Sequence, residues 1–221
     1  MISPAPGIAE PAPSGAGALS AAARRPGRKR DLAAEQRILR AALEVFTSGG
    51  WRGFSLDTVA RAAGAGKSTM YLRYANRQEL LLAVLAEYGY TGAASLSDHG
   101  SLRADLGDFA HSYAQWLDGP AGFLSIRIAV EARLNPDFAE VVRPVAVSQI
   151  SQAHAIVRRA KHRGEIPGSV STAVLLDAVV GGLINHAVSA PGKAPYASAA
   201  GRRFVDELVT DILHGVMLSG D

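Results

Sequence analysis

A short segment rich in hydrogen-bonding side chains follows the turn Gly64-Ala65-Gly66 of this 221-residue chain. Its polar residues are Lys67, Ser68, Thr69, Tyr71 and Arg73. Lysine donates to the O6 and N7 atoms of guanine, and serine and threonine hydroxyls reach several base edges. Only Met70 and Leu72 are apolar, so the segment offers few anchors for a helix that serves packing alone. We therefore expect a helix whose polar face binds DNA.

Neighbouring helices must hold this segment, because a helix of seven residues is not stable alone. Apolar residues at helical spacing predict one helix over residues 32–47, with Asp31 as N-cap and Gly49-Gly50 at its end. A second helix begins after the N-cap Ser55, and Asn76 with Glu79 opens another in capping-box spacing. Two short helices joined by a glycine turn predict a helix-turn-helix.

The stretch from Phe54 to Leu82 resembles the DNA-binding segment of the TetR family of bacterial transcription regulators. The matching residues are Thr58, Val59, Ala60, Ala63, Gly64, Thr69, Met70, Tyr71, Tyr74, Asn76, Arg77, Glu79 and Leu80. The chain departs from the family pattern at Gly66 (usually Ser), Ser68 (commonly Gly) and Ala75 (often Pro or Gly). The resemblance implies an all-α fold with an N-terminal DNA-binding domain and a larger helical domain for effector binding and dimerisation.

The resemblance also implies individual contacts with DNA. Thr58 would touch the DNA backbone from the second helix, and Tyr71 and Arg73 would contact phosphates or nearby bases. Arg77 would form a phosphate clamp together with free backbone N–H groups at the start of its helix. The alternative for Tyr71 is a core aromatic residue with a satisfied hydroxyl. Tyr74 is assigned mainly to the core.

Charge is distributed unevenly along the chain, which carries a formal net charge of +3. Residues 24–90 contain 12 Lys/Arg and 6 Asp/Glu, a net charge of +6, and the remainder contains 11 and 14, a net charge of −3. A basic third on a slightly acidic remainder is typical of a polyanion-binding domain. We expect a disordered tail over residues 1–30, with a basic arm at 24–30 that either lies on DNA or merely solubilises the chain.

The domain boundaries expected from these patterns are 31–91 for the DNA-binding domain and 92–221 for the second domain. Helices are expected in the second domain over residues 102–117, 123–134, 136–163, 171–189 and 199–218. Pro144 should kink the third of these or mark a joint between two helices. No signal peptide is visible, and the most apolar run, Val174 to Ile184, is short and interrupted by Asp177. A cytoplasmic protein is therefore expected, without a membrane partner.

The family resemblance implies a pocket for a small apolar organic effector in the second domain. Its candidate lining residues are Phe109, Tyr113, Trp116, Phe123, His154 and Asn185. A plain helical core is the alternative explanation of the aromatic residues. The last two helices are expected to form a homodimer contact, with intramolecular packing as the alternative. The residues involved would be Ala178, Val179, Gly181, Gly182, Asn185, Phe204, Leu208, Ile212 and Val216.

Nothing in the sequence predicts catalysis, a metal site or a cofactor. Gly66-Lys67-Ser68 resembles the end of a phosphate-binding loop, but Arg61 occupies the position where that motif requires its first glycine. The chain contains no cysteine, and its histidines form no HExxH motif. The predicted function is a homodimeric repressor that binds a palindromic operator in double-stranded DNA and is released by its effector. The alternative is an architectural DNA-binding protein without an effector pocket.

Overall fold

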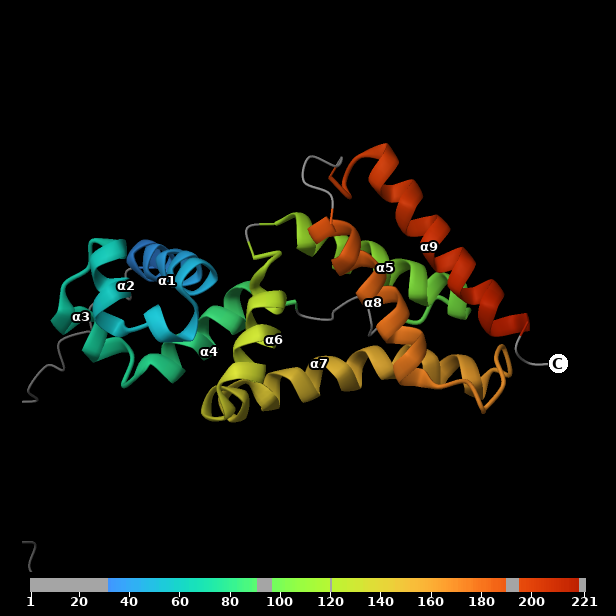
Figure 1. Cartoon of the computed structure of the whole chain (residues 1–221), viewed down its shortest axis with the longest axis horizontal. Coiled ribbons are helices and arrows are strands. Elements are labelled where there is room, and N and C mark those ends of the chain that lie inside the picture. Colours follow the sequence, from blue (N-terminus) through green and yellow to red (C-terminus); the bar gives the residue numbers. More distant parts are fainter. Residues whose placement is uncertain (1–31, 91–96, 120, 190–194, 219–221) are drawn as a thin grey trace, which may run out of the picture. The chain divides into compact units, whose positions relative to one another are not determined.

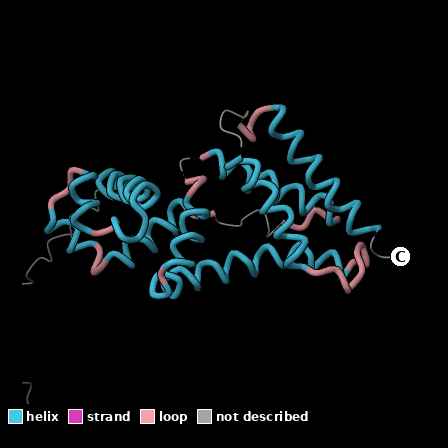
Figure 2. The backbone as a smooth tube through the Cα atoms, in the orientation of Figure 1, coloured by secondary structure: helices cyan, strands magenta, loops and turns pink. Residues whose placement is uncertain are grey.

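The computed structural model describes residues 32–90, 97–119, 121–189 and 195–218. These residues form α-helices joined by short connections, and the described ranges contain no strand (Figure 2). The all-α prediction is therefore confirmed. The predicted tail, the basic arm at 24–30 and the proposed N-cap Asp31 lie outside the described residues.

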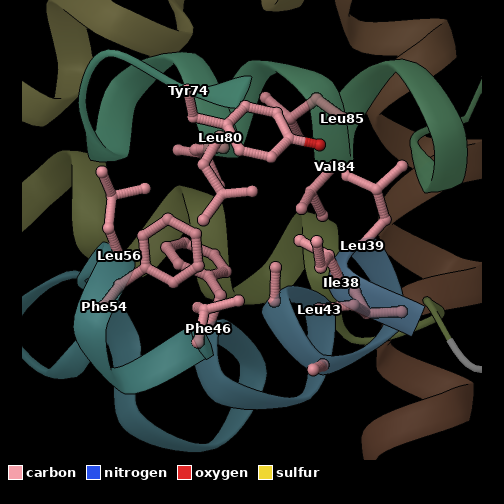
Figure 3. Packing of buried hydrophobic residues seen from close by; sticks show 14 of the residues in the cluster. Ile38, Leu39, Leu43, Phe46, Phe54, Leu56, Tyr74, Leu80, Val84 and Leu85 are labelled. Atoms are coloured by element: carbon pink, nitrogen blue, oxygen red, sulfur yellow. The ribbon is translucent and has the colours of Figure 1, made fainter. Parts of the chain in front are cut away.

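The first four helices pack around one apolar cluster, and we call them the head (Figure 1). They are α1 (Leu32–Gly53), α2 (Leu56–Ala63), α3 (Lys67–Arg73) and α4 (Arg77–Tyr88). The predicted apolar face of α1 points into this cluster, where Ile38 and Phe46 meet Phe54, Leu80 and Val84 (Figure 3). Since the short helices α2 and α3 contribute few residues to the core, the long helices α1 and α4 hold them in place.

The end of α1 differs from the prediction, because helical turns continue beyond Gly49-Gly50 to Gly53. The chain kinks at Gly50, which has φ 62° and ψ −168°. A positive φ of this kind costs glycine little and other residues considerably more. The kink directs the following Trp51 into the core, where its ring lies 5.0 Å from that of Phe138.

The predicted N-caps Ser55 and Asn76 are confirmed. The Ser55 hydroxyl accepts a hydrogen bond from the Thr58 backbone N–H at 3.1 Å, and Gly64 ends α2 in the left-handed conformation with φ 61°. The Asn76 side chain accepts from the Glu79 N–H at 2.9 Å. The Glu79 carboxylate reaches back to the N–H of Ala75 at 2.7 Å, one residue earlier than an ideal capping box. These bonds fix where α2 and α4 begin.

The remaining helices, which we call the body, agree with the predicted segments to within one residue at each end. They are α5 (Leu102–Asp118), α6 (Leu124–Leu134), α7 (Pro136–His162), α8 (Thr172–Ser189) and α9 (Ala199–Leu218). Phe123 is the N-cap of α6 rather than its first residue. α7 is one helix that runs through Pro144, so of the two predicted alternatives, a kink or a joint between two helices, the joint is wrong.

A buried carboxylate connects the start of α5 to the end of α7. The side chain of Asp105 is fully buried and accepts hydrogen bonds from the His99 N–H at 2.6 Å and from Arg159 Nη2 at 3.1 Å. Arg163 Nη2 lies 3.4 Å from the same carboxylate. Burial alone would raise the Asp105 pKa, but these donors and positive charges outweigh it and hold the pKa below its ordinary value. The carboxylate is therefore charged and paired at neutral pH.

Helix α8 is apolar but is not a typical core helix. Among the described helices, α8 is the one that is long and apolar enough to cross a membrane by length and composition. Of its residues Thr172–Ser189, 22% are buried. One such helix is weak evidence for a membrane span, so the expectation of no membrane partner is not contradicted. Val174 and Val188 are 67% and 51% exposed. The helix thus carries more apolar surface than its own chain covers.

Candidate DNA-binding and effector sites

The predicted DNA-binding helix α3 presents an exposed polar surface. Its buried anchor is Met70, which is fully buried, whereas Leu72 is 87% exposed and is not the second anchor that the sequence suggested. Lys67, Ser68 and Thr69 are all exposed in its first turn. Gly66 has no side chain to cap α3, so the first backbone N–H groups of this helix receive no capping bond from it.

The two tyrosines of this region have different environments. Tyr71 is 57% exposed, so the alternative that it is a core aromatic residue is wrong. Tyr74 is buried, as expected. Tyr71 therefore lies on the same exposed helix as Lys67, and its side chain is accessible from solvent as DNA contact would require.

Lys67 is held by a carboxylate of α2. Its Nζ atom lies 2.8 Å from Asp57 Oδ2, and both side chains are exposed to solvent. The hydrogen bond and the charge of Asp57 raise the pKa of Lys67 above its ordinary value, so the lysine is fully charged at neutral pH. Thr58, the next residue of α2, is partly buried, and its hydroxyl lies 2.8 Å from the Ser55 hydroxyl. Both predicted contacts on this side of the head already have partners within the protein.

The two arginines assigned to DNA are also engaged within the chain. Arg73 Nη1 lies 3.6 Å from Glu35 Oε2 of α1, so this side chain is partly turned toward the protein. The Arg77 guanidinium stacks on Trp51 at 3.9 Å from the ring centroid, and its Nη1 donates to the Trp51 carbonyl oxygen at 3.1 Å. The structure therefore gives Arg77 a packing role that the sequence did not suggest, in addition to its predicted role as a phosphate clamp.

A cavity of about 290 Å³ lies in the body, next to the end of α4. Four helices contribute its wall, with Leu85 from α4 and Tyr113 and Trp116 from α5. The Trp116 indole N–H donates to the Tyr88 carbonyl oxygen at 2.8 Å, which ties the wall to the last turn of α4. The remaining lining residues are Gly89, Tyr90, Leu124, Ser125, Ile128, Ala129, Ala132, Val142, Val145, Ala146 and Gln149.

The predicted pocket residues are brought together only in part. Tyr113 and Trp116 line the cavity. Phe109 is buried one turn away, with its ring 6.2 Å from that of Tyr113, and it supports the wall without lining it. Phe123 is 60% exposed, and Asn185 lies on the exposed side of α8. Neither of these two residues nor His154 lines this cavity.

Sequence reasoning missed the wall that α6 and α7 contribute. The prediction selected aromatic and amide side chains, whereas this wall consists of small and aliphatic residues such as Ala129 and Val145. Their helical spacing of three to four residues was a usable signal, but the same spacing describes an ordinary core. The cavity arises because small side chains leave space, and that property depends on how the helices pack.

The expected dimer surface on α8 divides into two faces. Ala178 and Gly181 are exposed, together with Asn185. Val179 is fully buried, and a Cβ atom added at Gly182 would lie 3.0 Å from Leu208 of α9 in the same chain. For these two residues the intramolecular alternative was the right one.

An all-α fold with an exposed helix-turn-helix and a second helical domain that encloses a cavity defines a class of DNA-binding regulators. Two family descriptions match the chain: "Bacterial regulatory proteins, tetR family" over residues 38–84 and "Tetracyclin repressor-like, C-terminal domain" over residues 96–210. The chain therefore belongs to the TetR family of transcriptional regulators. Membership places it among DNA-binding regulators, and no enzymatic activity is indicated.

Relatives from other bacteria agree with this assignment. The chain is 27% identical over 150 residues to the HTH-type transcriptional regulator AqdR of Rhodococcus erythropolis, covering 68% of this chain and 72% of that protein. It is 28% identical over 188 residues to the DNA-binding transcriptional repressor TetR of Mycobacteroides abscessus, covering 80% and 90%.

Solved structures support the fold. Salmonella enterica GusR superposes with a TM-score of 0.61 at 19% identity, covering 85% of this chain and 97% of the other. Bacillus subtilis FadR in complex with stearoyl-CoA superposes with a TM-score of 0.60 at 15% identity, covering 85% and 99%.

Proposed function

We propose that the protein is a homodimeric repressor that binds a palindromic operator in double-stranded DNA and is released by a small-molecule effector. The observation that carries the proposal is α3, whose exposed Lys67, Ser68, Thr69 and Tyr71 stand on the buried anchor Met70. In this proposal residues 31–91 bind DNA, and residues 92–221 bind the effector and form the dimer. The repressor named in M. abscessus supports the sign of regulation, and cytoplasmic DNA would be its site of action.

The exposed stripe of α8 supports the homodimer. Val174, Ala178, Gly181, Asn185 and Val188 are exposed and follow one another at intervals of four and three residues. That spacing places them on one face of the helix, and small residues let two helices approach closely. A second copy of the same surface, related by a two-fold axis, would cover the stripe. Two-fold symmetry would also set two heads on the inverted halves of one DNA site.

The cavity supports control by an effector. It is apolar, and ligand pockets are mostly apolar with few polar groups. Leu85 belongs both to the wall of the cavity and to α4, whose other end carries Arg77 beside α3. A ligand that favours one position of α4 would therefore act on the head. The cavity favours this proposal over an architectural DNA-binding protein, which needs no ligand site.

Selection of bound fragments from a random pool of double-stranded DNA tests the proposal. We expect inverted half-sites roughly one or more helical turns apart, and a two-chain assembly in sedimentation at the concentrations used for binding. Binding should weaken steeply with salt, because Lys and Arg side chains displace counterions from phosphates. A selected site without dyad symmetry, or a monomer that binds with full affinity, would contradict it.

A further inference from the structure

None of the described residues that line the cavity carries a charged side chain. Among the described residues that line it, the polar ones are Tyr90, Tyr113, Trp116, Ser125 and Gln149, and the others are aliphatic residues or glycine. A carboxylate, phosphate or ammonium group placed here would lose its hydration without gaining a counter-charge. The cavity therefore disfavours ionic ligands.

The nearest charged residues of α6 point elsewhere. Arg127 and Glu131 pair with each other at 2.9 Å, and both side chains meet α1 at Gly50. The face of α6 that meets the cavity instead carries Ser125, Ile128 and Ala132. The charged residues of α6 thus lie on one face of the helix, and the residues that line the cavity lie on another.

Three aromatic rings form one side of the cavity. The ring centroids of Tyr90 and Tyr113 lie 5.0 Å apart at an interplanar angle of 80°, and those of Tyr113 and Trp116 lie 5.4 Å apart at 41°. Rings held in this way present both faces and edges to the space beside them, and a flat ring can stack on the former or meet the latter. The rest of the lining includes aliphatic residues such as Ile128 and Val145. Such walls fit a flat molecule better than a flexible chain.

Two hydroxyl oxygens at the cavity, Tyr90 Oη and Ser125 Oγ, are buried and make no hydrogen bond of good geometry with the described residues. The Ser125 hydroxyl lies near enough to Tyr113, and the Ser112 hydroxyl near enough to Tyr90, to oppose the effect of burial on the pKa of each tyrosine. Burial prevails and raises both pKa values. Both tyrosines are therefore neutral at pH 7, and the buried hydroxyls of Tyr90 and Ser125 favour a ligand that accepts a hydrogen bond from them.

We propose that this cavity binds a small, uncharged molecule with a flat ring system and one hydrogen-bonding oxygen, which lies against Ser125 and the tyrosines. The volume supports this class, because about 290 Å³ is at the small end of the roughly 300–1,000 Å³ typical of ligand pockets. The inference rests on the proposed function only in taking this cavity as the effector site. Stearoyl-CoA, the ligand of the FadR complex, is long and highly charged and belongs to a different chemical class.

Isothermal titration of the full chain with matched probes tests the proposal. The probes are 2-naphthol and 2-naphthoate, which share a ring system and differ in charge, and 1-decanol and decanoate, which replace the ring by a chain. We expect 2-naphthol to bind at least tenfold more tightly than each of the other three. Equal or tighter binding of either anion, or of the decanol, would overturn the proposed class.

The variant Ser125→Ala tests whether 2-naphthol binds in this cavity. The variant removes one hydroxyl at a half-buried position of α6, so the fold should be retained. We expect it to reduce the affinity for 2-naphthol to that for naphthalene, while the affinity for naphthalene stays the same. Unchanged binding of 2-naphthol would place the ligand elsewhere and overturn the assignment. Operator release is measured separately: a probe that binds as expected without releasing DNA would count against the proposed function and leave the ligand class standing.

Discussion

Lys67 of the exposed helix α3 and Asp57 of α2 form an ion pair of 2.8 Å on the surface predicted to face DNA. The lysine must leave or share this carboxylate when it meets a guanine or a phosphate. Because both side chains are solvent-exposed, the pair contributes little to folding. Its consequence is for binding: Asp57 places a negative charge beside the DNA and directs Lys67 at the same time.

Asp57→Asn should raise the affinity for unrelated DNA more than the affinity for the operator, so that discrimination narrows. The substitution removes a charge that repels phosphates and frees Lys67 to bind any of them. Competition binding with operator and random duplexes at several salt concentrations measures the effect. Glu87→Gln, an equal change of charge at the exposed end of α4, is the control. It should leave the ratio of operator affinity to random-DNA affinity unchanged. A larger ratio of operator affinity to random-DNA affinity in Asp57→Asn would mean that Asp57 does not restrain Lys67.

Arg77→Ala should weaken binding to all DNA sequences about equally, and it should also destabilise the head. The loss of a phosphate contact reduces the salt slope by roughly one unit. The loss of the stacking on Trp51 and of the bond to its carbonyl oxygen should cost about 1–2 kcal/mol of unfolding free energy. Arg77→Lys is the control, because it keeps the charge but not the planar stacking. DNA binding lost without any change in urea unfolding would show that the contacts with Trp51 are energetically neutral.

Gly181→Leu and Gly182→Leu make the same change at adjacent positions and should have different effects, the first on dimerisation and the second on the stability of the monomer. A Cβ atom added at Gly181 meets nothing within 4 Å, and a leucine there would project from the exposed stripe, so we expect folded monomers in sedimentation. At Gly182 the new side chain meets Leu208 of the same chain, so we expect loss of stability by roughly 1–3 kcal/mol. A dimer that survives Gly181→Leu would remove α8 from the interface.

Sequence reasoning reached the helices because local signals set their limits. Ser55, Gly64 and Asn76 begin or end helices through bonds within four residues of themselves, and such signals are readable in a single sequence. The partners of Arg77 and Gly182 could not be read in this way. Trp51 is 26 residues from Arg77, and Leu208 is 26 residues from Gly182, so these contacts depend on how the helices pack. The positions of Phe123 and Asn185 outside the cavity lining could not be read for the same reason, because they too depend on how the helices pack.

Asp105→Asn should destabilise the body at neutral pH by roughly 2–4 kcal/mol, because it leaves the guanidinium groups of Arg159 and Arg163 without their buried carboxylate. Since the pKa of Asp105 is lowered in the folded protein, its contribution is present above the ordinary pKa of 3.8 and is lost as the pH falls through the lowered value. The difference between variant and parent should therefore shrink in acid, measured by urea unfolding at pH 7 and pH 3. Asp108→Asn, at an exposed carboxylate, is the control and should cost under about 1 kcal/mol. Equal losses at both pH values would contradict the assignment of a charged Asp105.

The contact between α1 and α6 gives the cavity a second connection to the head, besides α4. Ser125 and Ile128 of α6 line the cavity, whereas Arg127 and Glu131 of the same helix lie against Gly50. A ligand that shifts α6 would therefore move the contact at the kink of α1. A Cβ atom at position 50 would clash with both charged side chains, and the positive φ there disfavours any residue but glycine.

Gly50→Ala should consequently cost about 1–3 kcal/mol of unfolding free energy and should weaken the coupling between effector and operator. We expect the factor by which a releasing ligand reduces operator affinity to fall at least tenfold, while ligand affinity without DNA changes little. By reciprocity, the effect of operator DNA on ligand affinity should fall by the same factor. Gly49→Ala is the control, because a Cβ atom there meets nothing within 4 Å. The double variant Gly50→Ala, Arg127→Ala should recover part of the coupling, since it removes one of the clashing side chains. Full coupling in Gly50→Ala would leave α4 as the connection between cavity and head.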